Sequence, residues 1–186
     1  MMKSVKNLDG AAVNVGVFSG EHQWLAGIHE YGCHITPGKA KYLTVPLCPE
    51  AAKAKARDFQ NTFVYTSKTG KKFIAQKNGK NLKLLYWLAE EVNIPERSFL
   101  RTGFDTNVDV VFRKVSRAFP NVLKGTKSED EYLETVGTLL RDCIKDYAVQ
   151  LSDPPKKMGF ARDPAKTNPL VISGDMINGI EYEVKR

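Results

Sequence analysis

An α+β fold is the class that this sequence predicts, with a mixed or antiparallel sheet packed against one long helix and one or two shorter ones. Residues 128–151 carry apolar side chains at helical spacing over about six turns. Short alternating apolar runs at 13–17 and 180–184 are typical of half-buried strands. Two β-branched and aromatic runs, 62–66 and 72–76, flank a turn-rich segment and predict a β-hairpin.

The chain of 186 residues is long enough to bury the core of one domain. We expect a single domain over residues 1–186, with a β-rich insertion at residues 35–92. A composition of 42% hydrophobic and 26% charged residues excludes a disordered or collagen-like chain. The apolar stretches are too short to cross a bilayer, so we expect no membrane partner. The N-terminus lacks the apolar run of a secretory signal, which predicts synthesis in the cytoplasm.

The first elements are a strand at residues 13–17 and a short helix after it. Ser19 is the expected cap of that helix, and Gly32 lies where the helix would end. Apolar residues recur in it at helical spacing, namely Trp24, Leu25 and Ile28. Within the insertion we expect a helical turn at residues 51–57, and either a further strand or a buried segment at residues 84–92.

Two longer helices are predicted in the second half of the chain. The first begins near Asp105 or Thr106 and runs to about Phe119, where Pro120 is expected to stop it. Its expected apolar face consists of Val108, Val111, Phe112, Val115 and Phe119.

The second helix, at residues 128–151, is expected to contribute most of the core. It begins with a capping box formed by Ser128 and Glu131. Its apolar face consists of Tyr132, Leu133, Val136, Leu139, Leu140, Cys143, Ile144, Tyr147 and Leu151. Cys143 on that face is expected to be a small core residue. Ser173 is the expected cap of a short helix before the last strand.

The motifs of catalysis and metal binding are absent, so we expect no enzyme activity, no cofactor and no metal. His29 is followed by His34 at a spacing that does not fit the zinc-binding helix, and the sequence has no Cys-x-x-Cys pair. A phosphate-binding P-loop and a Gly-x-Ser-x-Gly nucleophile motif are also missing. Three widely spaced cysteines fit a reducing compartment better than a disulfide framework.

The net charge of +7 comes entirely from the first part of the chain. Residues 1–80 carry 12 Lys and Arg against 5 Asp and Glu, whereas the remainder carries 16 of each. The candidates for a basic surface are Lys39, Lys41, Lys68, Lys71, Lys72, Lys77 and Lys80. Such a surface fits nucleic acid, but it also fits solvated or subunit-facing lysines that protect hairpin edges from aggregation.

Aromatic residues are interleaved with these lysines. They are Tyr42, Phe59, Phe63, Tyr65 and Phe73. Exposed aromatic rings would serve to stack single-stranded bases, and alternation on a hairpin would equally bury them.

Three segments together resemble the virion-morphogenesis proteins of tailed bacteriophages, the neck or tail-completion proteins at the head–tail junction. They read LAGIHEYG at 25–32, IPERSFLR at 94–101, and NPLVISGDM at 168–176, the last followed by the strand at 180–184. The similarity spans roughly residues 12–185. Two departures are that family members often have a helix before the first strand, and commonly have Thr-Gly-Arg where this chain has Ser173-Gly174-Asp175.

The resemblance implies a structural protein of the virion. We expect a cyclic homo-oligomer, a hexameric ring around the channel through which DNA passes without its sequence being read. The implied partners are a head-closure or adaptor protein and a tail terminator or tail tube protein. Two alternatives remain open at this point: a tail terminator protein, and a basic nucleic-acid-binding module.

The second segment suits a subunit contact, because Pro95 fixes the backbone and its two arginines can bond carboxylates bidentately. The alternative is that Arg97 only ties its own loop to the fold. The candidates for the subunit interface are His29, Glu30, Tyr31, Ile94, Pro95, Arg97, Phe99, Leu100 and Arg101.

Overall fold

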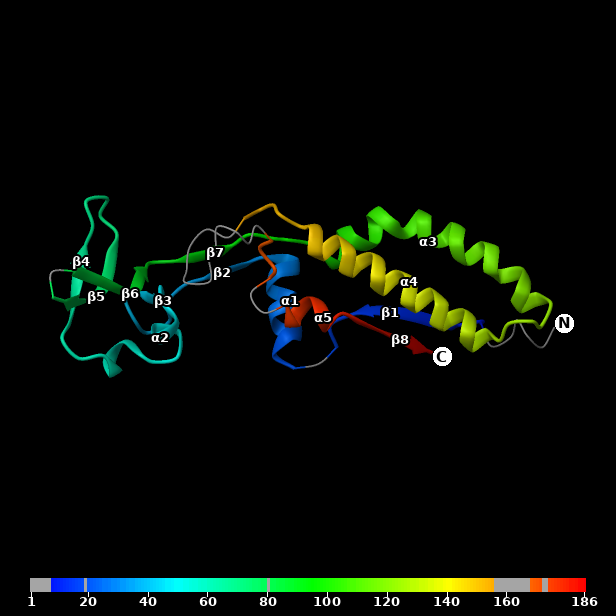
Figure 1. Ribbon diagram of the computed structural model, residues 1–186, viewed down its shortest axis with the longest axis horizontal. Helices are drawn as coiled ribbons and strands as arrows, with labels where there is room; N and C mark the ends of the chain where they lie inside the picture. The colour runs from blue at the N-terminus through cyan, green and yellow to red at the C-terminus, as the bar shows by residue number, and fades with distance from the viewer. Residues whose placement is uncertain (1–7, 19, 80, 156–167, 172–173) are drawn as a thin grey trace. The chain divides into compact units, whose positions relative to one another are not determined.

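The computed structural model describes residues 8–18, 20–79, 81–155, 168–171 and 174–186, and it confirms an α+β fold (Figure 1). Within these residues every paired strand is antiparallel. The helices are α1 (Glu21–Tyr31), α2 (Pro49–Ala52), α3 (Leu100–Leu123), α4 (Glu129–Gln150) and α5 (Asp175–Asn178). The strands are β1 (Ala12–Gly16), β2 (Cys33–Ile35), β3 (Leu43–Pro46), β4 (Thr62–Thr66), β5 (Lys72–Asn78), β6 (Asn81–Ala89), β7 (Val92–Ile94) and β8 (Glu181–Lys185).

The chain divides into two compact units. The first contains the described residues of segments 1–32, 95–154 and 168–186. The second contains those of segments 33–94 and 155–167, which include strands β2 to β7. No described helix is long and apolar enough to cross a membrane.

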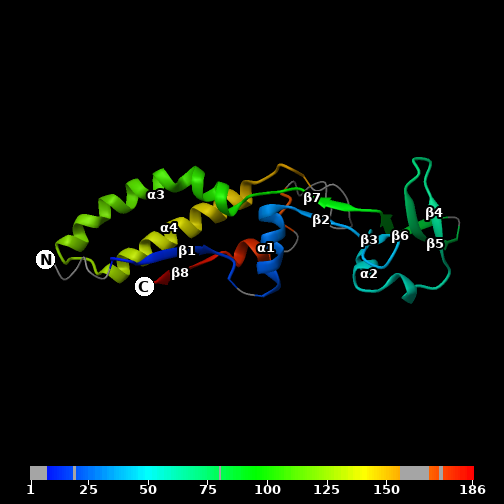
Figure 2. The same cartoon turned by 180° about the vertical axis from the view of Figure 1, so that it is seen from behind.

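The first unit is built on the hairpin of α3 and α4, with strands β1 and β8 beside α4 (Figures 1 and 2). β1 and β8 pair in the register Ala12 to Lys185 and Gly16 to Glu181. The predicted strands at both ends of the sequence are therefore present and form one two-stranded sheet. The core of the first unit consists of Val17, Ala26, Phe99, Ile144, Ala148, Leu170, Met176, Ile177 and Ile180.

The predicted capping box of α4 is confirmed. The Ser128 hydroxyl accepts a hydrogen bond from the Glu131 N–H at 3.1 Å, and the Ser128 N–H donates to the Glu131 carboxylate at 2.9 Å. These bonds satisfy two backbone donors that an isolated helix end leaves without partners. Cys143 is only partly buried and has a free thiol, so it lies at the edge of the core instead of inside it.

The predicted bounds of the preceding helix were wrong at both ends. α3 begins at Leu100, before the predicted start at Asp105 or Thr106, because a side chain distant in sequence caps it. It also continues beyond Pro120 to Leu123. Proline removes one hydrogen bond, but the last turn still closes through the Lys124 N–H and the Pro120 carbonyl oxygen at 3.1 Å.

Two residues of the apolar patterns that predicted these helices are exposed. Trp24 is 72% exposed on α1, and Phe112 is 68% exposed on α3. The buried residues of these helices, such as Ala26, Val111 and Val115, lie on other faces. Helical spacing alone did not show which edge of each apolar stripe faces the core. The predicted caps Ser19 and Ser173 lie outside the described residues.

The second unit contains a four-stranded sheet in the order β3-β6-β5-β4 and a separate ribbon of β2 with β7. The predicted hairpin is confirmed, because Thr62 of β4 pairs with Gln76 of β5. The segment at 84–92 contributes to β6 and the start of β7. The expected helical turn at 51–57 is present in part, as the end of α2 and the start of a 3-10 turn at Ala56–Asp58.

A small core lies between this sheet and the helical turns. Tyr86 of β6 is 3% exposed, and its hydroxyl donates hydrogen bonds toward the carbonyl oxygens of Ala51 and Ala54 at 3.0 and 2.7 Å. The ring also meets Phe59 edge to face, with 6.0 Å between the ring centroids. Tyr86 therefore ties the helical turns to the sheet.

Candidate subunit interface

Glu30 lies in the last turn of α1 and is only 3% exposed. Its carboxylate accepts hydrogen bonds from the N–H groups of Leu100 and Arg101 at 2.9 and 3.1 Å. It also accepts one from the Ser98 hydroxyl at 2.7 Å. The residue at the N-cap position of α3 is Phe99, which has no side-chain oxygen, so Glu30 supplies the cap from another helix.

Arg101 joins this cap through its guanidinium group. Its Nε donates to Glu30 at 2.9 Å, and its Nη2 donates to the Glu30 carbonyl oxygen at 3.1 Å and to the Glu96 carboxylate at 2.6 Å. The guanidinium also lies over the ring of Tyr31, 4.9 Å from the centroid. With its side chain 52% exposed, Arg101 fixes the segment and still reaches the surface.

The electrostatics of this cluster favour the ionised carboxylate. Burial by itself raises the pKa of Glu30, but hydrogen bonds from Leu100, Ser98 and Arg101 together outweigh burial and hold the pKa below its ordinary value of 4.5. The hydrogen bond to Glu30 is the main reason that the pKa of Arg101 is raised. The pair is therefore charged throughout the neutral range.

Arg97 is 5% exposed and ties its own segment to the first unit. Its Nε donates to the Pro154 carbonyl oxygen at 2.7 Å, and its N–H donates to the His29 carbonyl oxygen at the same distance. Its Nη1 lies 3.3 Å from His29 Nδ1, which accepts because a guanidinium can only donate. Burial lowers the pKa of Arg97. These intrachain contacts favour the positioning role over a direct contact with another subunit.

Phe99 is fully buried and belongs to the same core as Leu170, Met176 and Ile180. The three segments that carry the family resemblance therefore meet in space. The first and second are joined through Glu30, and the second and third through the packing around Phe99. Leu100, which is partly buried, packs against this core as well.

The remaining interface candidates lie in different surroundings. Tyr31 is 69% exposed at the end of α1. Pro95 is partly buried at the start of the segment. Ile94 belongs to the second unit, where it pairs with Cys33 in the ribbon of β2 and β7. The exposed part of the candidate interface is thus centred on Tyr31 and Arg101.

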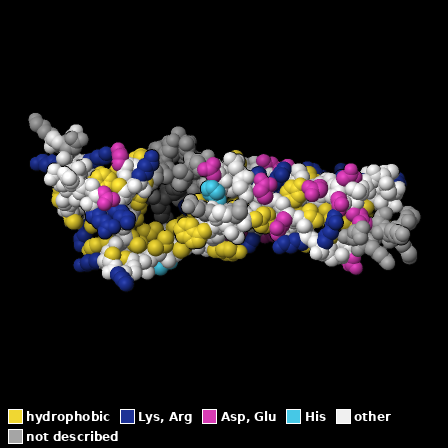
Figure 3. Space-filling model, turned by 90° about the horizontal axis from the view of Figure 1, so that it is seen from below, with side chains coloured by type: hydrophobic (Ala, Val, Ile, Leu, Met, Phe, Trp, Pro, Cys, Tyr) yellow, Lys and Arg dark blue, Asp and Glu magenta, His cyan; other side chains and the backbone are white. Residues whose placement is uncertain are grey.

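The basic-surface candidates belong to the second unit, where Figure 3 shows Lys and Arg side chains on the surface. Exposed side chains are those of Lys39, Lys41, Lys68, Lys71 and Lys77. Lys72 is partly buried, and Lys80 lies outside the described residues.

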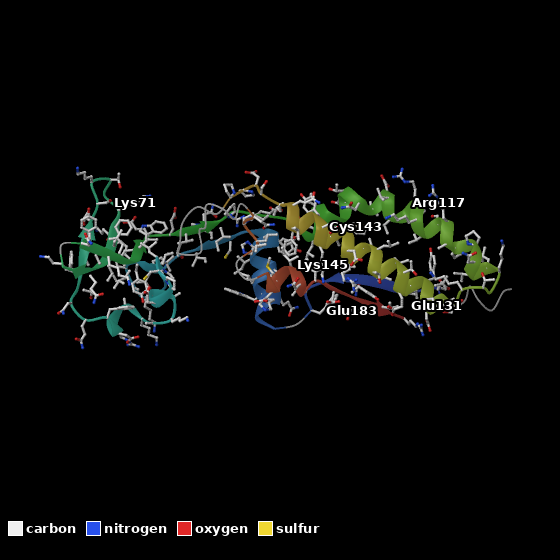
Figure 4. All side chains as sticks on the ribbon, viewed as in Figure 1. Lys71, Arg117, Glu131, Cys143, Lys145 and Glu183 are labelled. Carbon is white, nitrogen blue, oxygen red and sulfur yellow. The ribbon has the colours of Figure 1, made fainter. Side chains whose placement is uncertain are left out.

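Three of these lysines lie against aromatic residues, and Lys41 Nζ is 5.7 Å from the Tyr42 ring centroid. Lys72 Nζ donates to the Tyr42 hydroxyl at 2.8 Å, which raises the pKa of Lys72. Lys71 Nζ lies 5.9 Å from the Trp87 ring centroid; Figure 4 labels Lys71 in this unit.

The aromatic residues interleaved with the lysines of the basic surface mainly pack against the sheet. Tyr65, Phe73 and Trp87 lie in one row across β4, β5 and β6, because they are direct partners in the strand register. Phe73 is 6% exposed, whereas Phe63 is 44% exposed and is the most exposed of the five interleaved aromatic residues. The basic surface therefore carries positive charge but few exposed aromatic rings on which bases could stack.

No group of three or more His, Cys, Asp or Glu side chains in the described ranges is arranged to hold a metal ion. Comparisons of the chain with protein-family models, with curated proteins and with solved structures find no match.

The cap that Glu30 forms on α3 is the feature of this site that the sequence analysis did not predict. The lack of a capping side chain before Leu100 was the one signal that could have indicated it.

Proposed function

We propose that the chain is a structural subunit of the neck of a tailed bacteriophage, joining head to tail as part of a ring around the DNA channel. The observation that carries the proposal is the convergence of the three resembling segments on one core through Glu30 and Phe99. Segments that recur together in a family are expected to support one structural element. Here that element is the junction of α1, α3 and the C-terminal segment.

The same geometry indicates which side chains would meet a neighbouring subunit. Trp24 and Tyr31 are seven residues apart, or about two turns, so they share one face of α1. They are 72% and 69% exposed, and exposed aromatic residues are the commonest anchors of protein interfaces. Arg101 lies against Tyr31 and adds a charged, partly exposed edge. We assign the contact to Trp24, Tyr31 and Arg101.

The test is complementation of a gene deletion in the source phage or prophage, with the lysate viewed by electron microscopy. The deletion should give filled heads and finished tails that are not joined. The double variant Trp24→Ala, Tyr31→Ala should fold as the wild type does and fail to restore joined particles. Val149→Ala, 59% exposed on α4, is the control and should restore them. Infectious particles from the deletion itself would refute the neck function.

The charge of the second unit favours one alternative, a basic nucleic-acid-binding module. Residues 33–94 contain 11 Lys and Arg against 4 Asp and Glu. A module of this kind would bind duplex or single-stranded DNA with a steep dependence on salt. Sub-micromolar binding by the free chain at physiological salt would favour this module over the neck subunit. The tail terminator alternative is separated by partners, because a terminator would bind tail tube protein without the head-closure protein.

A further inference from the structure

A row of four charged side chains runs along the surface of α3. Its members are Asp105, Asp109, Arg113 and Arg117, each four residues after the one before. Residues at this spacing form one continuous ridge on a helix, and this ridge is about 18 Å long. All four side chains are exposed to solvent, and Figure 4 shows Arg117 on the side of α3 that is turned away from α4.

The charges of this ridge have no ion-pair partner among the residues that the structure describes. None of the four side chains forms an ion pair with any residue in the part of the chain that the structure describes. Other exposed charges do form such pairs, for example Lys83 with Glu50 at 3.2 Å. Relative to the described residues, the ridge therefore presents two negative charges followed by two positive charges, none of them in an ion pair.

This order is self-complementary. When two copies of the ridge lie antiparallel about a two-fold axis midway between Asp109 and Arg113, each Asp109 faces the other copy's Arg113. Each Asp105 then faces the other copy's Arg117. A parallel arrangement in the same register would place like charges together. The pattern thus selects the antiparallel pair, in which the same patch serves both copies.

Apolar side chains flank the middle of the ridge. Phe112 is 68% exposed and Val110 is 39% exposed. An apolar side chain gains no stabilisation from a position that faces solvent. Packing two such ridges into the adjacent grooves is the commonest helix contact, with the axes crossing at about 50°. It would cover both copies of Phe112 near the two-fold axis and surround them with the ion pairs. A buried aromatic centre with a charged rim is the usual anatomy of a protein interface.

We propose that α3 is a self-association surface, on which a second copy of this chain packs antiparallel through Asp105, Asp109, Arg113 and Arg117 around Phe112. This inference does not depend on the proposed function. A two-fold contact closes after two copies, so it does not by itself build a ring. It is a contact of the chain in addition to the one that we assign to Trp24 and Tyr31.

The test is a charge swap on the full chain, followed by sedimentation velocity over a range of concentrations. One variant carries Asp105→Arg and Asp109→Arg, and the other carries Arg113→Asp and Arg117→Asp. Each should weaken self-association at least about tenfold, because every facing pair becomes a like-charge pair. An equimolar mixture of the two should restore association, and so should the variant with all four changes. Circular dichroism checks that each variant is folded.

Two controls separate this contact from a general charge effect. Asp146→Arg alters an exposed charge on α4 that forms no ion pair among the described residues, and it should leave association unchanged. Phe112→Ser should weaken association without changing any charge. A wild-type mass that neither double variant alters, or a mixture that stays as dissociated as its components, would overturn the proposal.

Discussion

Gly137 of α4 lies directly against the ring of Tyr182 of β8. A Cβ atom at position 137 would stand 2.6 and 2.7 Å from the Cε2 and Cγ atoms of that ring. The Tyr182 hydroxyl bonds Glu134 and lies 3.4 Å from the Thr138 hydroxyl. Glu134 and Thr138, one helical turn apart on α4, therefore both hold the hydroxyl end of this ring. Here the absence of a side chain sets how closely the sheet approaches the helix.

Gly137→Ala should therefore destabilise the first unit, against the usual trend. Alanine normally stabilises a helix interior by about 1 kcal/mol relative to glycine. Displacing a well-packed ring costs roughly 1–3 kcal/mol, which exceeds that gain. Urea unfolding should show a lower midpoint. Gly137→Ala with Tyr182→Leu should recover part of the loss, and a more stable single variant would contradict the close approach.

Glu30→Gln should remove a stabilisation that depends on pH. The pKa of Glu30 is lowered in the folded chain, so its contribution is present above its ordinary value of 4.5 and is lost as the pH falls through the folded value. At pH 7 we expect a loss of about 2 kcal/mol, because Leu100, Ser98 and Arg101 lose a charged acceptor. The difference from wild type should shrink on acidification below pH 4.5.

The control for this pH profile is Asp146→Asn on α4, which is exposed and should leave the unfolding free energy nearly unchanged at every pH. Equal stability of wild type and Glu30→Gln at pH 7 would mean that the cap contributes nothing.

Phe99→Ala should unfold the first unit instead of acting on assembly alone. Phe99 is fully buried, and truncation of a buried phenylalanine costs about 3–5 kcal/mol. Guanidinium unfolding monitored by near-ultraviolet circular dichroism measures the loss. If the variant were as stable as wild type, the packing of Leu170 and Met176 around this ring would be refuted.

Tyr86→Phe should destabilise the second unit by about 1–2 kcal/mol. The variant keeps the ring but leaves the carbonyl oxygens of Ala51 and Ala54 without the hydroxyl. Tyr65→Phe on β4 is the matched control, because its hydroxyl forms no hydrogen bond among the described residues. Hydrogen exchange of the amides of β5 and β6 would report the change, and equal protection in both variants would speak against the role of the hydroxyl.

The sequence predicted what depends on local chemistry. The capping box of Ser128 and the hairpin of β4 with β5 follow from residues close together in the chain, and both are present. The start of α3 depends on Glu30, which lies 70 positions before Leu100, so no local pattern contains it. The sequence indicated which segments form the candidate interface, but it did not indicate which of their residues are buried. The first segment places Tyr31 on the surface, whereas the second places Phe99 inside the core.

The pairing of β1 with β8 has a consequence for the time course of synthesis. Val13 faces Val184, so the sheet cannot close until almost the whole described chain has been made. At about 5–20 residues per second, β1 waits on the order of ten seconds or more for its partner. Strands β4, β5 and β6 are neighbours in the chain and can pair soon after they emerge. We therefore expect the second unit to fold during translation and the first to finish last, so a truncated or stalled product would hold a formed hairpin beside an unclosed terminal sheet.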